Sequence, residues 1–268
     1  MQSISGALRS APRRLGGNPT LVFELWATDR GITHRLKAPW QHADYVMSQL
    51  LSLVPGIRYS PEDHPPFHDW KCIVEIGETD PSRSLRIPSP EYLSSSLLAS
   101  VQALGEGEAL LMQWVVTPAV PQRPPSEHKS FPTSHWSYRL LTGEIVADQD
   151  EVKDRRAKLS EPNFLGVLRL AAKAETEARA DHLLHGRVQA ALASVRSPNN
   201  RFKKRRFTMY LPERVRNASG SMVFPAQLSA SELVGLIAWP IGEPHIAGLP
   251  QSRARHLPAT EAYLALAE

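Results

Sequence analysis

The chain has 268 residues, of which 42% are hydrophobic and 22% are charged. This composition predicts a soluble globular protein with a hydrophobic core and excludes a disordered or collagen-like chain. The 31 Lys and Arg residues exceed the 27 Asp and Glu residues by only four charges, so a nucleic-acid site has to be argued from local clusters of cations.

The sequence indicates a cytoplasmic location. Its one cysteine, Cys72, excludes an internal disulfide, which fits a reducing compartment. No apolar run approaches the roughly 18 residues that span a bilayer. Residues 1–19 are predicted to be a flexible basic tail, because they lack the apolar core of a signal peptide.

Residues 20–117 are predicted to form a first domain. Apolar and polar residues alternate on both sides of Asp29-Arg30-Gly31, which predicts a β-hairpin. Ser89 and Pro90 have the order of a helix N-cap followed by proline at the first helical position. The expected elements are a hairpin over 20–37, a helix over 41–54, strands over 70–76 and 84–87, a helix over 90–104 and a buried strand over 109–116.

Prolines mark a boundary after this domain. Five of them between Pro118 and Pro132 remove backbone donors, so residues 118–135 are predicted to be a linker. A second domain is expected over 136–226. Its predicted elements are strands over 136–141, 164–171 and 206–210 and helices over 148–159 and 175–195.

Residues 227–268 are expected to add a short helix. Ser229 and Glu232 have the spacing of a capping box. Taken together, the elements predict the α+β class, with two small domains of mainly antiparallel sheets, helices packed on one face, and a ferredoxin-like or split βαβ arrangement. Arg169, inside an apolar strand, is expected to point to solvent.

The motifs that hold nucleotide phosphates are missing from these residues. A P-loop places lysine directly after its second glycine, and none of the 15 glycines is followed by lysine. Gly105-Glu106-Gly107 follows a predicted helix, which is the wrong order for a dinucleotide site. We therefore expect no cofactor and no small-molecule substrate.

His64, His68 and Cys72 have a spacing that suits zinc if Asp63 supplies a fourth ligand. The two prolines that follow His64 forbid a helix with these residues on one face, so we expect no metal. A hydrolase whose site assembles in space, around His64 and His68, stays open as an alternative, although the chain has no G-x-S-x-G motif.

The densest cluster of charge is a run of five cations flanked and interrupted by phenylalanines. The candidate nucleic-acid-binding residues are Arg201, Lys203, Lys204, Arg205 and Arg206. Cations of this kind neutralise phosphates, and aromatic rings stack on bases. A solvated strand edge whose lysines discourage aggregation is one alternative. A contact with an acidic protein or a membrane surface is the other.

Three stretches are similar to the region that precedes the motor domain in actinobacterial conjugative type IV secretion ATPases. They are residues 24–58, which contain Glu24-Leu25-Trp26 and Leu53-Val54-Pro55-Gly56; residues 162–180, which contain Pro162-Asn163-Phe164 and Arg169-Leu170-Ala171-Ala172; and residues 228–240. The last is the best marker, because a serine-any-glutamate-leucine helix that ends at Trp239-Pro240 resembles the lead-in to the P-loop domain. Residues 253–259 look like the stretch just upstream of it. The resemblance therefore implies that residues 227–268 form a short helix and a lead-in to a motor domain.

The resemblance implies a DNA-translocating or secretion motor built as a ring of subunits. The family often has membrane segments near its N-terminus, which this chain lacks, so contact with the inner face of a membrane is expected to run through partner proteins. Its phosphate loop and acidic magnesium ligand are expected after residue 268, so no ATPase residue can be assigned in this chain. The first hypothesis is a non-catalytic assembly or docking module whose partners are secretion-channel proteins, other subunits of the same motor, or DNA. The second is a free-standing nucleic-acid-binding protein that uses residues 201–207, and the third is the small hydrolase.

Overall fold

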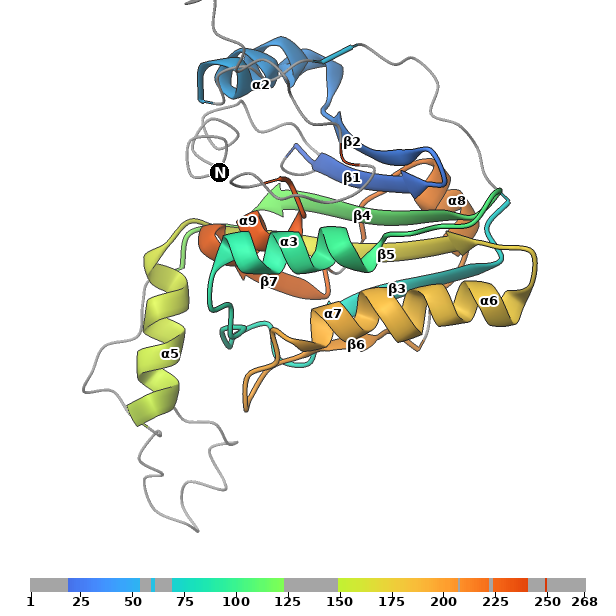
Figure 1. The fold of residues 1–268 in the computed structure, drawn as a ribbon. Coiled ribbons are helices and arrows are strands. Elements are labelled where there is room, and N and C mark those ends of the chain that lie inside the picture. The colour runs from blue at the N-terminus through green and yellow to red at the C-terminus, as the bar shows by residue number, and fades with distance from the viewer. Residues whose placement is uncertain are drawn as a thin grey trace, which may run out of the picture.

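The computed structural model describes residues 19–53, 59–60, 69–122, 149–206, 208–221, 224–240 and 249. Within them lies an open seven-stranded antiparallel sheet with helices packed against it (Figure 1), which confirms the α+β class. The strands are β1 (Leu21–Thr28), β2 (Gly31–Lys37), β3 (Cys72–Glu78), β4 (Ala109–Pro118), β5 (Asn163–Lys173), β6 (Phe202–Lys204) and β7 (Ala226–Ser229).

The order of strands across the sheet is β2-β1-β4-β5-β3-β6, and β7 also pairs with β5. β3 and β7 lie one after the other along the same side of β5, since β3 pairs with its second half and β7 with its first. The junction is tight: a Cβ added at Gly77 would lie 2.5 Å from the Cβ of Pro225. Glycine is therefore required at this position by the close approach of the two segments.

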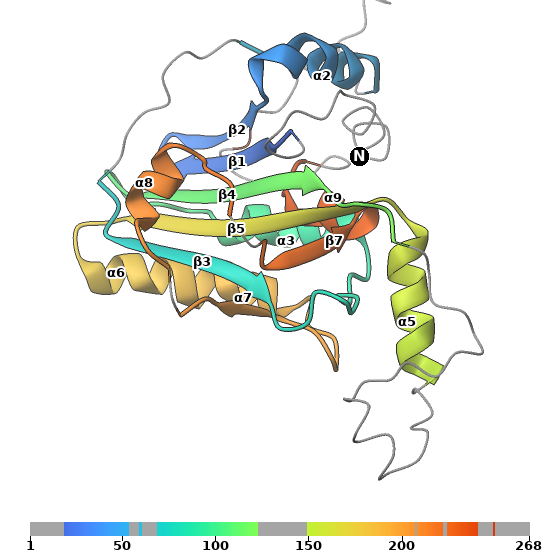
Figure 2. The ribbon, with the colours of Figure 1, turned by 180° about the vertical axis from the view of Figure 1, so that it is seen from behind.

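The helices cover both faces of the sheet unequally. They are α2 (Trp40–Leu53), α3 (Pro90–Ser100), α5 (Gln149–Ser160), α6 (Glu177–Asp181), the π-helix η1 (His182–Val188), α7 (Gln189–Ala193), α8 (Leu211–Arg216) and α9 (Ala230–Leu236). α3, α9 and the continuous α6–η1–α7 helix lie on one face, whereas α8 lies on the other, as the view from behind shows (Figure 2). α5 stands at one end of the sheet.

The main core lies between the sheet and the larger helical layer. Side chains alternate between the two faces of a strand, so every second residue of β1, β4 and β5 enters this core, including Phe23, Met112 and Leu168. Trp114 is fully buried, and its indole N–H donates to the carbonyl of Leu236 at 3.0 Å. This bond joins the centre of the sheet to the end of α9.

Most predicted elements are confirmed, including the first hairpin, α2, the helix capped by Ser89, the charged helix α5 and the long helix after β5. Two predicted strands are wrong. Residues 84–87 form no strand, because the amide of Leu85 donates to Glu232 and that of Arg86 to the carbonyl of Val195. The predicted strand over 206–210 lies too late, since β6 ends at Lys204. The strand predicted over 136–141 lies outside the described residues.

The expected division into two separate sheets is corrected by the strand order. β5, from the second predicted domain, lies between β4 and β3 of the first, and β6 extends the sheet beyond β3. β7, which belongs in part to the predicted lead-in, pairs with β5 as well. The sequence is organised in two halves, but their strands interleave in one sheet.

Candidate functional site

Four of the five predicted nucleic-acid-binding residues are exposed. Arg201, Lys203, Lys204 and Arg206 lie on or beside β6, the short strand at one edge of the sheet. Within the described part of the chain, none of these four side chains forms an ion pair. Arg205 differs, because its side chain is 30% exposed and its Nη1 lies 2.7 Å from Oε1 of Glu75. The structure therefore brings the predicted cations together but assigns one of them to a buried carboxylate.

Glu75, in the middle of β3, is the point where three arginines meet. Its carboxylate is fully buried and lies 3.1 Å from Nε of Arg169, 2.7 Å from Nη1 of Arg205 and 3.3 Å from Nη2 of Arg214. One negative charge is thus shared by three guanidinium groups. This part of the molecule carries an excess of positive charge, which reaches the surface through the partly exposed side chains of Arg205 and Arg214.

Glu75 and Arg169 belong to a row of polar residues that crosses the sheet. Glu24, Gln113, Arg169 and Glu75, called the polar row below, are cross-strand neighbours on β1, β4, β5 and β3 in turn. All four are buried on the face that α8 covers. Gln113 donates to Oε1 of Glu24 at 2.8 Å and accepts from Nη1 of Arg169 at 3.2 Å. Buried charges need partners of this kind, because isolated ones are costly.

Arg169 was expected at the solvent face, and that expectation is wrong: its side chain is completely buried. Burial lowers the pKa of Arg169, and the hydrogen bond to Glu75 opposes that shift. Sequence reasoning missed the row because each member is a single polar residue inside an apolar strand. The available signal was that four separate strands each carry one such residue, which a shared row would explain.

α8 is held on the polar row by its backbone. Arg169 donates to the carbonyl of Arg214 at 3.1 Å and to that of Ser219 at 2.6 Å, while Gln113 donates to the carbonyl of Val215 at 2.9 Å. The last carbonyls of a helix have no partner within the helix, and cations are favoured beside them. The buried side chains therefore act as a C-terminal cap that fixes α8 against the sheet.

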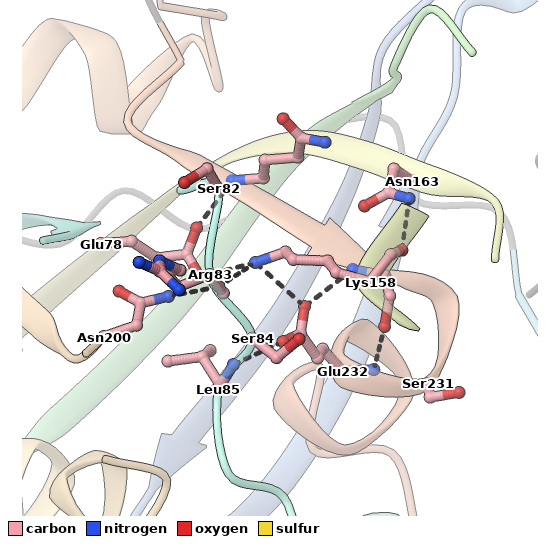
Figure 3. A network of polar contacts seen from close by, with 12 residues as sticks. Glu78, Ser82, Arg83, Ser84, Leu85, Lys158, Asn163, Asn200, Ser231 and Glu232 are labelled. Atoms are coloured by element: carbon pink, nitrogen blue, oxygen red, sulfur yellow. Dashed lines mark hydrogen bonds and ion pairs between the residues drawn. The ribbon is translucent and has the colours of Figure 1, made fainter. Parts of the chain in front are cut away.

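A second buried network is centred on Lys158 of α5 and joins this helix to four other segments (Figure 3). Nζ of Lys158 lies 3.4 Å from Oε1 of Glu78 and 3.5 Å from Oε2 of Glu232, and it donates to the carbonyl of Arg83 at 2.6 Å. Asn200 donates to Glu78 and to the same carbonyl of Arg83. Every member is buried or half-buried, so this network ties α5, β3 and α9 together rather than facing a substrate.

Burial has a marked effect on the acids of this network. It raises the pKa of Glu78 to about 7, although Lys158, the amide of Gln227 and Asn200 lower it. Burial also raises the pKa of Glu232, against the opposing effect of Lys158. When two buried carboxyls share one ammonium, the two negative charges repel each other, so one carboxyl is expected to lose its proton only close to neutral pH.

One cavity of about 280 Å³ lies between the end of β4 and the end of α5. Its lining includes Val120, Glu161 and Asn163. The carboxylate of Glu161 accepts bonds from the amide and hydroxyl of Ser231, and the side-chain amide of Asn163 donates to the carbonyls of Lys158 and Glu161. These hydrogen bonds join the end of α5 to the start of β5 and to α9. The polar groups that line the cavity include no pair of an acid and a base suited to hydrolysis.

The other predicted candidates lie partly outside the described residues. His64 and His68 are not described, so the hydrolase interpretation built on them stays a prediction. Cys72 is half-buried at the start of β3, and burial raises the pKa of its thiol, which disfavours the reactive thiolate. Among the described residues, no group of three His, Cys, Asp or Glu side chains is placed to hold a metal ion.

Comparisons of the chain with protein-family models, curated proteins and solved structures find no match. In the part of the chain that the structure describes, no helix combines the length and apolar character needed to cross a bilayer.

Proposed function

We propose that this chain is a non-catalytic module of a DNA-transfer machine and that it binds nucleic acid with the basic edge of its sheet. The observation that supports the proposal is the display of four exposed cations on or beside β6, namely Arg201, Lys203, Lys204 and Arg206. Each cation placed on a phosphate releases a condensed counterion, which favours binding. The resemblance to the region before the motor domain of conjugative ATPases suggests the DNA-transfer machine in which such a module would act.

The test is a binding assay with the whole chain on labelled single-stranded and duplex DNA over a range of salt concentrations. Charge reversal of two exposed cations, Lys203→Glu with Lys204→Glu, is expected to weaken binding at least about tenfold at low salt. It should also reduce the slope of log affinity against log salt by about 1 to 2, because each phosphate contact contributes roughly 0.7 to 0.9 to that slope.

The matched control is Arg30→Glu with Lys153→Glu, which makes the same change in net charge. Both control residues are exposed, one in the β1–β2 turn and the other on α5. Affinity is expected to change little in the control. Absence of binding by the unaltered chain at low salt would contradict the proposal, and equal losses in both pairs would show that net charge, not β6, is responsible.

A second candidate function, assembly with a neighbouring subunit, is favoured by α2. Only Val46 and Leu50 of this helix are buried, whereas Trp40 is 83% exposed and Tyr45 is 48% exposed. Aromatic side chains of this kind are enriched where proteins meet. Sedimentation of the whole chain should therefore show self-association that Trp40→Ser with Tyr45→Ser abolishes. A monomer at every concentration would argue against this role.

A further inference from the structure

Tyr210, at the start of α8, is placed unusually for an aromatic residue. Its side chain is 71% exposed, and its backbone lies in the left-handed region, with φ 55° and ψ 37°. That conformation is unfavourable for any residue with a Cβ and is uncommon outside glycine, asparagine and aspartate. The side chain forms no capping bond to the helix. Packing and capping therefore do not explain a tyrosine here.

The face of the sheet that α8 covers carries several cations. Side chains alternate along a strand, so Lys203 and Arg205 point to the face of α8, whereas Phe202 and Lys204 point to the opposite face. The structure bears this out at two points, because Arg205 reaches Glu75 on the α8 face and Phe202 packs on Trp114 in the main core. Lys204 is therefore an exposed cation on the same strand whose side chain points to the opposite face of the sheet.

β6 and α8 are joined on this face through one carboxylate. Arg205 and Arg214 both contact Glu75, at 2.7 Å and 3.3 Å. Tyr210 precedes Arg214 by four residues, and the amide of Arg214 donates to the carbonyl of Tyr210 at 3.0 Å. Tyr210 is the N-cap residue, so this bond places its backbone at the first turn of the helix that carries Arg214. The exposed ring of Tyr210 and the partly exposed side chains of Arg205 and Arg214 therefore form the surface at the start of α8.

The surface is held in place before any ligand arrives. The carbonyls of Arg214 and Val215 accept bonds from Arg169 and Gln113 of the polar row, which are themselves fully buried. A site that is already ordered loses less entropy when it binds. The polar row therefore acts as the support of α8, and Arg169 and Gln113 are positioning residues for this surface.

We infer that Tyr210 stacks on an unpaired base while Lys203, Arg205 and Arg214 lie on the neighbouring phosphates, so that the ligand of this site is single-stranded nucleic acid. The inference rests on the proposed function. An exposed ring beside a row of cations is the combination that binds single strands, because the faces of their bases are free to stack on protein rings. In a duplex these faces are covered by neighbouring base pairs.

The experiment measures binding of the whole chain to a labelled single strand and to the matching duplex. Tyr210→Ala is expected to weaken single-strand binding by roughly 5- to 150-fold, the range for loss of one base–aromatic stack, and to leave duplex binding unchanged. Tyr210→Phe, which keeps the ring, should bind like the unaltered chain. Lys203→Ala should weaken single-strand binding more than Lys204→Ala, which removes the cation on the opposite face.

Stability provides a second measurement. Tyr210→Gly relieves the left-handed backbone, so its melting temperature is expected to equal or exceed that of the unaltered chain even though single-strand binding is lost. Loss of binding together with a lower melting temperature would mean that Tyr210 has a structural role, and the inference would be wrong.

The outcomes separate the two proposals. Salt-dependent binding without a preference for single strands, and without an effect of Tyr210→Ala, would overturn the inference and leave the nucleic-acid module standing. No binding of either strand type at low salt would overturn both.

Discussion

Arg169 shows how a single buried side chain can organise a large part of this molecule. Its guanidinium serves four acceptors on three segments, namely Glu75, Gln113 and the carbonyls of Arg214 and Ser219. Arg169→Met is expected to lower the free energy of unfolding by about 3 to 5 kcal/mol, because these buried acceptors lose their donor. Arg169→Lys should not restore stability, since one ammonium cannot reproduce the fork of a guanidinium.

A matched control is available in the ion pair of exposed Arg179 with half-buried Glu108, whose Nε and Oε1 lie 2.7 Å apart. Arg179→Met removes the same kind of contact at the surface, where water screens it, and should change stability little. Denaturant unfolding of both variants measures the difference. Equal effects at the two sites would mean that the polar row contributes no more than a surface ion pair.

Glu78 predicts a pH dependence of stability. Its pKa in the folded protein is raised from 4.5 to about 7 by burial, so the folded state holds the proton more tightly than the unfolded state does. The stabilisation is complete below about pH 4.5 and is lost as the pH rises through about 7. A difference of this size corresponds to about 3 kcal/mol.

The test compares the unaltered chain with Glu78→Gln across this range of pH. Glutamine does not titrate, so the difference in unfolding free energy between the two proteins should change steadily between about pH 4.5 and 7.5. Glu232 is present in both proteins, and its charge raises the pKa of Glu78, so the difference between the two curves reports the coupled pair from which Glu78 has been removed. Two parallel curves would show that Glu78 ionises normally in the folded chain.

At the scale of an element, α9 is stabilised through Glu232, which takes part both in the local cap of the helix and in contacts with distant segments. Ser229 and Glu232 form the capping box that the sequence predicted, with Ser229 Oγ accepting from the amide of Glu232 and the carboxylate accepting from the amide of Ser229. Glu232 also accepts from the amide of Leu85 at 2.6 Å and lies 3.5 Å from Nζ of Lys158.

The two halves of this cap should therefore differ in their effect on stability. Ser229→Ala removes only the local bond and is expected to cost about 1 kcal/mol. Glu232→Ala should cost about 3 kcal/mol, because it also leaves a buried amide and a buried ammonium short of an acceptor. Thermal unfolding of the two variants measures the gap, and similar melting temperatures would show that α9 is stabilised by its local cap alone.

Elements with a strong local pattern could be predicted from the sequence, and elements made by tertiary contacts could not. The long helices and β1, β4 and β5 repeat their apolar residues over ten or more positions or alternate around a clear turn. α8 and β7 are only six and four residues long. Such segments carry too few repeats to show a period, and their backbone bonds are made to distant side chains and to β5.

The candidate site divides in the same way. The cluster of cations is contiguous in sequence, so its exposure at a strand edge could be predicted as one alternative. The polar row could not, because its four members lie on four strands that are not all neighbours in sequence. Their meeting depends on the strand order, which brings β5 between β4 and β3.

At the scale of the whole molecule, this order predicts that neither half of the sequence folds alone. β3 lies in the first half, yet both of its described partners, β5 and β6, lie in the second. β5 in turn would lose β3 and β4. Residues 19–122 and 149–240 produced as separate chains should each lack a cooperative unfolding transition, since the interleaved strands cannot bury their apolar faces.

Mixing the two pieces should restore the fold, because the missing strands are then supplied in trans. Trp114 contributes to the measurement, because it is fully buried in the whole chain and belongs to the first piece. The tryptophan fluorescence of the mixture should therefore shift to the blue relative to that of the two separate pieces. Arg169→Met in the second piece should weaken this reassembly, since the polar row crosses the junction of β4 with β5 and of β5 with β3. Cooperative unfolding of either piece by itself would mean that the interleaving of strands is not what makes the two halves depend on each other.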